Sequence, residues 1–250
     1  MKILISGICG HMGRIVERLA LEGYSGAELA AGVDLRPDSN AKVECADSFD
    51  KARTDVDCIV DFSHHAVTKE LLDFAVKNSL PLVLATTGQT DEEKAMIKEA
   101  SKSIPLFFAA NYSLGIAILI ELAKKTAALM PDDEIEIIEK HHDRKIDAPS
   151  GTALAIADAL CTVRDDATLN LGRSGQAKRT KNEIGIHAVR MGNIVGDHEV
   201  IIGTNTQSIT LKHEAFDRSL FAEGALVAAA FLVGKPAGLY DMNSMVGGNL

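Results

Sequence analysis

Short apolar runs and amphipathic segments alternate along the first 110 residues of the chain. Runs of the strand type lie at residues 2–6, 29–33, 57–62, 82–84 and 106–108. Apolar residues at helical spacing, at residues 15–20, 71–75 and 92–101, predict helices between these strands. Regular alternation of strand and helix is typical of a parallel sheet covered on both faces. We therefore predict an α/β fold with a Rossmann-type doubly wound parallel sheet.

The pattern changes after a predicted helix over residues 116–129. Further strands are predicted with one helix, near Ala153, among them, and they lie at residues 134–139, 184–190, 199–202 and 208–211. Strands without helices between them favour a mixed or antiparallel sheet with one covered face. We therefore predict a second α+β domain built on a mixed sheet, followed by a last, alanine-rich helix over residues 220–233.

Composition excludes several classes of protein. The chain has 250 residues, 46% hydrophobic and 24% charged, which is ordinary for a globular protein of one or two domains. Its net charge of −9 argues against nucleic acid as a partner. The apolar run at residues 225–233 is far too short to span a membrane, and glycines break the first apolar run before it reaches the length of a signal peptide. We expect neither a nucleic-acid nor a membrane partner.

The cysteines point to a reducing environment. Cys9, Cys45, Cys58 and Cys161 form no C-x-x-C pair and no ligand-like cluster with nearby histidines. We therefore expect no metal site. Free thiols are typical of the cytoplasm, which is the location we predict.

A glycine-rich turn follows the first strand. Residues 7–13 read G-x-x-G-x-x-G, rather than the commoner G-x-G-x-x-G, and lead into a helix. A strand, a glycine turn and a helix together can seat a pyrophosphate on the helix N-terminus. Asp34 ends the second strand roughly 20 residues later, where an acidic residue meets the adenosine ribose of a dinucleotide. A glycine turn in some other α/β fold remains the alternative at this point.

The segment Glu139–Ala153 carries the most unusual chemistry. It combines adjacent histidines, His141 and His142, with an arginine and a lysine, in a chain with 26 Lys+Arg against 35 Asp+Glu. The preceding residues 133–139 alternate acidic and apolar, as a strand with one wet face does. The histidines lie at or just past the end of that strand, and adjacent residues of an extended chain point to opposite faces, so we expect them to have different roles.

A helix start follows the histidines. Ser150 is a good N-cap before an alanine-rich helix, so Ser150, Gly151 and Thr152 place free backbone N–H groups and two hydroxyls at its N-terminus. Such a terminus is suited to a carboxylate or phosphate. Surface histidines and an ordinary capped turn are the alternative for either piece alone, but the two pieces with a lysine between them favour a site for a small anion.

These motifs together resemble one family. G-x-x-G-x-M-G near the N-terminus, paired with E-x-H-H-x-x-K-x-D-x-P-S-G-T-A in the middle, is similar to the 4-hydroxy-tetrahydrodipicolinate reductase (dihydrodipicolinate reductase) family over essentially the whole chain. Further matching segments are 85–88, 109–113, 190–192 and 196–198. The resemblance implies reduction of a small cyclic dicarboxylate by hydride from NADH or NADPH, with loss of water, in the diaminopimelate route to lysine.

The resemblance also implies the roles of individual residues. His141 and Lys145 match the catalytic residues, as proton donor or acceptor and as the cation that offsets negative charge. The implied substrate-binding residues are His142, Ser150, Gly151, Thr152 and Thr87, the last facing the substrate across the cleft. The implied cofactor-binding residues are Gly7, Ile8, Cys9, Gly10, His11, Met12, Gly13, Asp34, Arg36, Ala85, Thr86, Thr87, Ala109, Ala110, Asn111 and Tyr112. Arg144 contributes to the positive field, and the role of Arg218 is left open.

The family pattern further implies the domain organisation. Residues 1–111 plus 219–250 are expected to form a discontinuous dinucleotide-binding domain, and residues 112–218 a substrate-binding and oligomerisation domain. Family members are usually homotetramers joined through the sheet of the substrate domain, so we expect the same assembly here.

Two departures from the family pattern bear on the cofactor. Many members have arginine where this chain has His11, which weakens the expected contact with phosphates, and Ala85 replaces a common glycine. Asp34 favours NADH because a carboxylate accepts hydrogen bonds from the ribose 2′-OH and repels a 2′-phosphate. Arg36 favours NADPH instead, because its guanidinium can bind a 2′-phosphate in bidentate fashion. We predict NADH as the preferred cofactor, with NADPH as a possible one.

Other functions remain open at this point. One is a different NAD(P)-dependent oxidoreductase for small anionic substrates, such as an amino-acid or semialdehyde dehydrogenase. The lack of a Cys or Ser nucleophile motif disfavours the semialdehyde type. Another is a non-catalytic nucleotide sensor, which has no need for both His141 and Lys145 beside an anion site.

Overall fold

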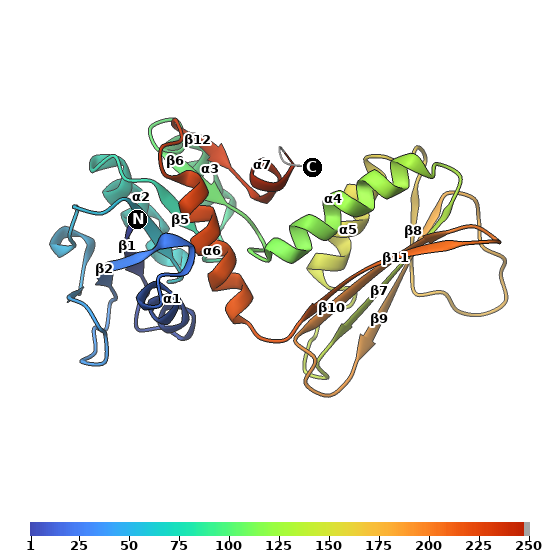
Figure 1. Cartoon of the computed structure of the whole chain (residues 1–250), viewed down its shortest axis with the longest axis horizontal. Helices are drawn as coiled ribbons and strands as arrows, with labels where there is room; N and C mark the ends of the chain where they lie inside the picture. The colour runs from blue at the N-terminus through green and yellow to red at the C-terminus, as the bar shows by residue number, and fades with distance from the viewer. Residues whose placement is uncertain (248–250) are drawn as a thin grey trace. The chain divides into compact units, whose positions relative to one another are not determined.

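The computed structural model describes residues 1–247, which divide into two compact units (Figure 1). Unit 1 comprises Met1–Ser113 and the C-terminal segment from Ser219, and unit 2 comprises Leu114–Arg218. The last part of the expected first domain, residues 248–250, lies outside the described residues. Tyr112 lies in unit 1, although we expected the second domain to begin there. Its buried hydroxyl lies 2.8 Å from Leu84 O and 3.1 Å from Phe107 O and can donate its one hydrogen to either.

Unit 1 is built on a seven-stranded sheet in which the strand pairs are parallel. Its strands are β1 (Lys2–Ser6), β2 (Glu28–Val33), β3 (Cys45–Ala46), β4 (Cys58–Asp61), β5 (Leu82–Leu84), β6 (Pro105–Phe108) and β12 (Gly238–Tyr240). The order β12-β6-β5-β4-β1-β2-β3 is that of a doubly wound sheet, with the direction of winding reversed between β1 and β4. The predicted Rossmann-type fold is confirmed.

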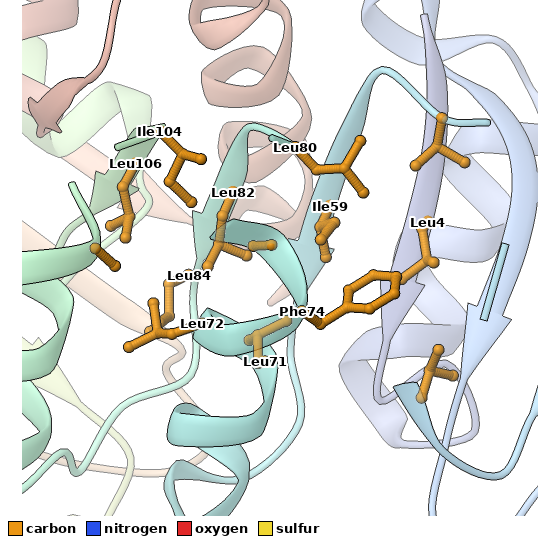
Figure 2. Packing of buried hydrophobic residues seen from close by; sticks show 14 of the residues in the cluster. Leu4, Ile59, Leu71, Leu72, Phe74, Leu80, Leu82, Leu84, Ile104 and Leu106 are labelled. Atoms are coloured by element: carbon orange, nitrogen blue, oxygen red, sulfur yellow. The ribbon is translucent and has the colours of Figure 1, made fainter. Parts of the chain in front are cut away.

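Helices cover both faces of this sheet. They are α1 (His11–Leu21), α2 (Thr68–Lys77), α3 (Asp91–Ala100), α6 (Ser219–Leu232) and α7 (Met242–Val246), with 3₁₀ turns η1 (Tyr24–Gly26), η2 (Phe49–Lys51) and η3 (His65–Val67). Helices α2 and α3 pack on one face, where Phe74 and Ile97 join a buried cluster with Leu4, Ile59 and Leu82 (Figure 2). Helices α1 and α6 contact each other and the central strands on the other face.

The start of α3 illustrates how local sequence determines these helices. The hydroxyl of Thr90 accepts a hydrogen bond from Glu93 N, and the Glu93 carboxylate accepts one from Thr90 N. This reciprocal capping satisfies two backbone donors, and the acidic first turn is favourable beside the positive end of the helix. The helix therefore begins at Asp91, one residue before the predicted start.

Unit 2 is a mixed five-stranded sheet of order β11-β10-β7-β9-β8. Its strands are β7 (Glu134–His141), β8 (Thr168–Leu171), β9 (Glu183–Arg190), β10 (Gly196–Gly203) and β11 (Ser208–Ala215). Strands β7 and β9, like β8 and β9, pair in parallel, whereas β10 pairs antiparallel with β7 and β11. The predicted mixed sheet is confirmed.

One face of this sheet is covered by α4 (Leu114–Leu129) and α5 (Gly151–Cys161) (Figure 1). Ile116 and Ile156 from these helices are buried together with Ile137 and Val200 of the sheet. Because alternate residues of a strand point to the same face, the residues at positions 135, 137, 139 and 141 of β7 all point inward.

Some elements escape prediction from the pattern. β3 has two residues and β8 is mostly exposed at a sheet edge, so neither carries a clear apolar alternation. β12 extends the sheet of unit 1 by pairing with β6. No helix among residues 1–247 has the length and apolar character needed to cross a membrane.

Candidate active site

The predicted cofactor-binding residues of unit 1 lie at one edge of the parallel sheet. The glycine turn follows β1, Asp34 follows β2, Ala85–Thr87 follow β5, and Ala109–Tyr112 follow β6. Parallel strands end at a common edge, and ligands of doubly wound sheets bind there at the point where the winding reverses. The topology therefore brings together residues that are more than 100 positions apart in the sequence.

The glycine turn requires glycine for steric reasons. Gly7 has φ +78°, and a Cβ there would lie 2.6 Å from Phe62 O. A Cβ at Gly13 would collide with the backbone of Gly7 and Ile8. Gly10 caps α1 without a side-chain hydrogen bond, and the first turn of α1 has no acidic residue. Its N–H groups and the helix dipole therefore favour an anion.

Asp34 connects the glycine turn to the loop after β2. Its Oδ2 accepts a hydrogen bond from Cys9 N at 3.0 Å, and its Oδ1 accepts one from Arg36 N at 2.9 Å. The side chain is held from both sides, whereas Arg36 is exposed. Gly7, Gly10 and Asp34 line a cavity of ≈ 260 Å³.

One wall of this cavity is missing from the residues predicted for the site. Phe62, Ser63 and His64, which follow β4, also line it. The predicted strand over residues 57–62 ends at the same edge as its neighbours, so its position in the sheet order was the signal for this wall.

Several predicted cofactor residues contribute little side chain to this edge. Ile8 is fully buried, and a Cβ at Gly32 would lie 2.7 Å from its Cδ1, so its side chain packs against β2. Tyr112 and Ala85 are also buried. His11 and Thr87 are exposed, and Met12, Asn111 and Ala109 are half-buried.

In unit 2, a buried carboxylate lies at the centre of the predicted substrate site. Glu139 is 0% exposed, and its Oε2 lies 2.6 Å from Nδ1 of His141. Both terminal nitrogens of Arg190 donate to it, at 2.8 and 2.7 Å. Ser150 N donates to Oε1 at 3.0 Å. The strand end and the helix start, 11 residues apart in sequence, therefore meet at one side chain.

The position of Glu139 corrects the predicted wet face of this strand. Glu134 and Glu136 keep the outward face, but the sequence places two apolar residues, Ile137 and Ile138, in succession while the strand keeps its regular alternation. Glu139 therefore points inward. Its acidic side chain is tolerated there because the charge is paired with Arg190 and fully hydrogen-bonded.

Burial and hydrogen bonding have opposite effects on the pKa of Glu139. Burial by itself raises the pKa of the carboxyl, but hydrogen bonds from Arg190, His141 and Ser150 N outweigh it and hold the pKa below its ordinary value. The group is therefore an anion at neutral pH, and it faces the ring of His141. His141 is the last residue of β7, within the strand rather than past its end.

His142 and the basic residues lie just beyond the strand. His142 is half-buried, and burial, then Arg144 and Arg218, lower its pKa, so the ring is neutral at pH 7. Arg218, whose role was left open, therefore contributes positive charge close to His142. Nζ of Lys145 lies 2.8 Å from Asp147 Oδ1.

The predicted anion clamp lies at the start of α5. The hydroxyl of Ser150 accepts a hydrogen bond from Ala153 N at 3.2 Å, as expected of an N-cap. Gly151 is exposed, and a Cβ there would meet no atom within 4 Å, so the space beside the helix start is open. Thr152 follows in the first turn.

The sequence did not identify His198 of β10 as part of the site. Its ring packs edge-on to that of His141, with centroids 5.2 Å apart, and its Nε2 lies 3.2 Å from Ser150 Oγ. Strand pairing places His198 opposite Glu139. Burial, assisted by His141, lowers the pKa of His198 to about 4. Among residues 1–247, no group of three or more His, Cys, Asp or Glu side chains could hold a metal ion.

A doubly wound sheet with a glycine turn and an acidic residue after β2, combined with a histidine- and lysine-bearing site, defines an NAD(P)-dependent oxidoreductase. Residues 1–112 match the family model "Dihydrodipicolinate reductase, N-terminus", and residues 115–246 match "Dihydrodipicolinate reductase, C-terminus". The chain belongs to the dihydrodipicolinate reductase family, so the resemblance seen in the sequence is confirmed.

Individual relatives agree with this assignment. Proteins named 4-hydroxy-tetrahydrodipicolinate reductase from Clostridium tetani and Caldanaerobacter subterraneus are 44% and 43% identical, over 98% of this chain and 97% and 98% of theirs. The solved structure of dipicolinate-bound dihydrodipicolinate reductase from Paenisporosarcina sp. TG-14 has the same fold. Its TM-score is 0.79 at 24% identity, over 98% of this chain and 99% of that chain.

The buried His198 leads to a prediction about stability. The folded state favours its neutral ring, so this stabilisation is complete above about pH 6.5 and is lost as the pH falls toward 4, because the unfolded chain binds the proton first. Between about pH 7.5 and 5, we expect the free energy of unfolding to fall by about 2 kcal/mol more in the wild type than in His198→Gln. Urea titrations at both pH values measure this, and equal pH dependence in the two proteins would contradict it.

Proposed function

We propose that this protein reduces 4-hydroxy-tetrahydrodipicolinate to tetrahydrodipicolinate, with loss of water, in the diaminopimelate route to lysine. The observation that carries the proposal is the link through Glu139, which joins His141 directly to the helix start at Ser150. A proton-transferring group and an anion-binding terminus side by side suit a substrate whose reacting ring carries carboxylates.

Unit 1 is proposed to hold the dinucleotide. The backbone of Gly7–Gly13 would receive the pyrophosphate at the N-terminus of α1, and Asp34 would accept hydrogen bonds from the ribose. The loops Ala85–Thr87 and Ala109–Tyr112 would line the nicotinamide end. When bound, the reduced dinucleotide supplies the hydride.

Unit 2 is proposed to hold the dicarboxylate. Gly151 and Thr152 would bind one carboxylate through their backbone N–H groups and the Thr152 hydroxyl. Ser150 would contribute through its hydroxyl, because its N–H is held by Glu139. Lys145 would offset the negative charge, with a flexible ammonium group that can also donate a proton. His141 would move the proton at its Nε2, because Nδ1 is engaged by Glu139.

Two other residues complete the proposed substrate site. His142, neutral and with its Nδ1 buried without a hydrogen-bond partner among the described residues, would hydrogen-bond the substrate. Thr87, exposed at the carboxyl end of β5, would contribute a hydroxyl from unit 1.

We further propose that the protein is a cytoplasmic homotetramer assembled through the sheet of unit 2. The support is the face of that sheet opposite α4 and α5, where Ile138 and Ile201 lie half-buried among charged residues. The free thiols of all the cysteines suit a reducing compartment.

The role of Lys145 gives the first functional prediction. We expect Lys145→Ala to reduce kcat by at least roughly 100-fold while NADH affinity stays nearly unchanged, since acid–base groups contribute about 10²–10⁴-fold. Steady-state kinetics and a fluorescence titration with NADH measure the two effects. Lys140→Ala, on the outward face of β7, serves as the matched control and should retain activity. A Lys145→Ala enzyme with wild-type kcat would refute the assignment.

The anion clamp gives a second prediction. Dipicolinate, a flat dicarboxylate, should inhibit competitively with the substrate, and Thr152→Val should weaken this inhibitor more than it weakens NADH, because one hydroxyl donor at the helix start is lost. Thr162→Val, at the opposite end of α5, is the control. If Thr152→Val leaves dipicolinate inhibition unchanged, or weakens both ligands equally, the clamp lies elsewhere.

Cofactor choice is the third prediction. We expect NADH to be preferred with residual use of NADPH, because the Asp34 carboxylate is fixed by two N–H groups whereas Arg36 is exposed. The ratio of kcat/KM for the two cofactors at one low salt concentration measures this, since salt screens phosphate contacts. Asp34→Asn should move the ratio toward NADPH, and Asp73→Asn on α2 should not. A wild-type preference for NADPH would show that Arg36 outweighs Asp34.

A further inference from the structure

The hydrogen bonds of Glu139 are unusually complete for a carboxylate in a protein core. Oε1 accepts from one terminal nitrogen of Arg190 at 2.7 Å and from Ser150 N at 3.0 Å. Oε2 accepts from the other Arg190 nitrogen at 2.8 Å and faces Nδ1 of His141 at 2.6 Å. Each oxygen therefore has one partner from Arg190 and one from a part of the proposed substrate site.

We propose that Glu139 is a positioning residue for the reduction: it holds the proton of His141 on Nδ1, so that Nε2 is the atom that exchanges protons, while it also fixes the helix start at Ser150. The inference rests on the proposed role of His141. Arg190 provides the counter-charge that allows the carboxylate to remain buried and ionised.

The chemistry of the carboxylate determines the tautomer. An ionised carboxylate only accepts hydrogen bonds, so the Nδ1 of His141 that faces it must carry the hydrogen. In the neutral ring, Nε2 then has a free lone pair. When Nε2 is protonated, the adjacent negative charge stabilises the imidazolium.

The surroundings of His141 leave room at Nε2. A Cβ at Gly196 of β10 would lie 3.0 Å from this nitrogen, so glycine at that position keeps the nitrogen clear. The other charged or titratable groups around the ring are His198 on β10, Arg190 on β9, and His142 and Lys145 beyond the strand end. Within residues 1–247, the hydrogen bond to the His141 ring comes from Glu139 and from none of these four groups.

Glu139→Gln distinguishes this role from a purely structural one. The amide NH₂ must face an Arg190 donor in either orientation. At the Oε1 position it would also oppose Ser150 N, whereas at the Oε2 position it can donate to Nδ1 of His141. The second orientation loses fewer hydrogen bonds, so the substitution should move the His141 proton to Nε2 and leave the helix start in place.

The experiment combines spectroscopy with kinetics on the full-length protein. In ¹⁵N-histidine NMR spectra above pH 7, with the His141 signals identified by their loss in His141→Asn, we expect the Nδ1–H tautomer in the wild type and the Nε2–H tautomer in Glu139→Gln. We expect kcat to fall roughly 100-fold in Glu139→Gln. The dissociation constant of dipicolinate should change less than about threefold, because the Oε1 contacts with Ser150 and Arg190 remain.

Matched controls separate the tautomer from the loss of a buried charge. Glu183→Gln removes another buried, arginine-paired carboxylate, at the opposite end of β9, and should keep both kcat and the His141 tautomer. Glu139→Asp retains the charge and should retain the Nδ1–H tautomer. A fall in kcat with an unchanged tautomer in Glu139→Gln would mean that Glu139 is only structural, and would overturn the inference.

The wild-type spectrum tests the inference even if Glu139→Gln does not fold. An Nε2–H tautomer of His141 in the wild type would contradict the inference directly. His141→Asn distinguishes a failure of the proposed role of His141 from a failure of the proposed role of Glu139. If His141→Asn keeps wild-type kcat, the proposed role of His141 fails. If His141→Asn loses activity while Glu139→Gln keeps both kcat and tautomer, only the role of Glu139 fails.

Discussion

The buried ion pair between Glu139 and Arg190 is the interaction on which the geometry of the proposed site in unit 2 depends. An unpaired carboxylate with no exposed surface would be strongly unfavourable, so the guanidinium and the two further donors are needed for the strand to bury it at all. Because these donors come from β7, β9 and the start of α5, satisfying one charge also aligns three elements. The hydrogen bonds that stabilise the buried charge therefore also determine the geometry of the site.

The two units share one structural arrangement at their proposed binding sites. Each places a helix N-terminus immediately after the end of a strand, α1 after β1 in unit 1 and α5 close to the end of β7 in unit 2. In α1 the terminus is capped by Gly10 without a side chain, and in α5 by the hydroxyl of Ser150. Both termini therefore offer the backbone N–H groups and the helix dipole that favour an anion.

The sequence predicted the features that depend on local pattern. The strand–helix alternation, the glycine turn and the capped helix start all follow from residues that are close in sequence, and the fold class was therefore predictable. Glu139, His198 and the wall after β4 were not identified as site residues, because their roles depend on strand pairing. The register that places His198 opposite Glu139 joins residues 59 positions apart. The one local clue was the adjacent pair Ile137 and Ile138: because the strand keeps its regular alternation, the acidic Glu139 falls on the inward face.

The interrupted course of unit 1 along the chain has a consequence for its synthesis. Helix α6 and strand β12 complete the sheet of unit 1, yet they are translated after the whole of unit 2. α6 is almost entirely apolar, and its buried residues cover strands that emerge from the ribosome more than 100 residues earlier. Unit 2 is continuous and can fold as soon as Arg218 has emerged, whereas one face of unit 1 is covered only by α1 until the C-terminal segment arrives. In the nascent chain, unit 2 can therefore be complete before unit 1, and the apolar surface of unit 1 that α6 later buries stays exposed during that interval.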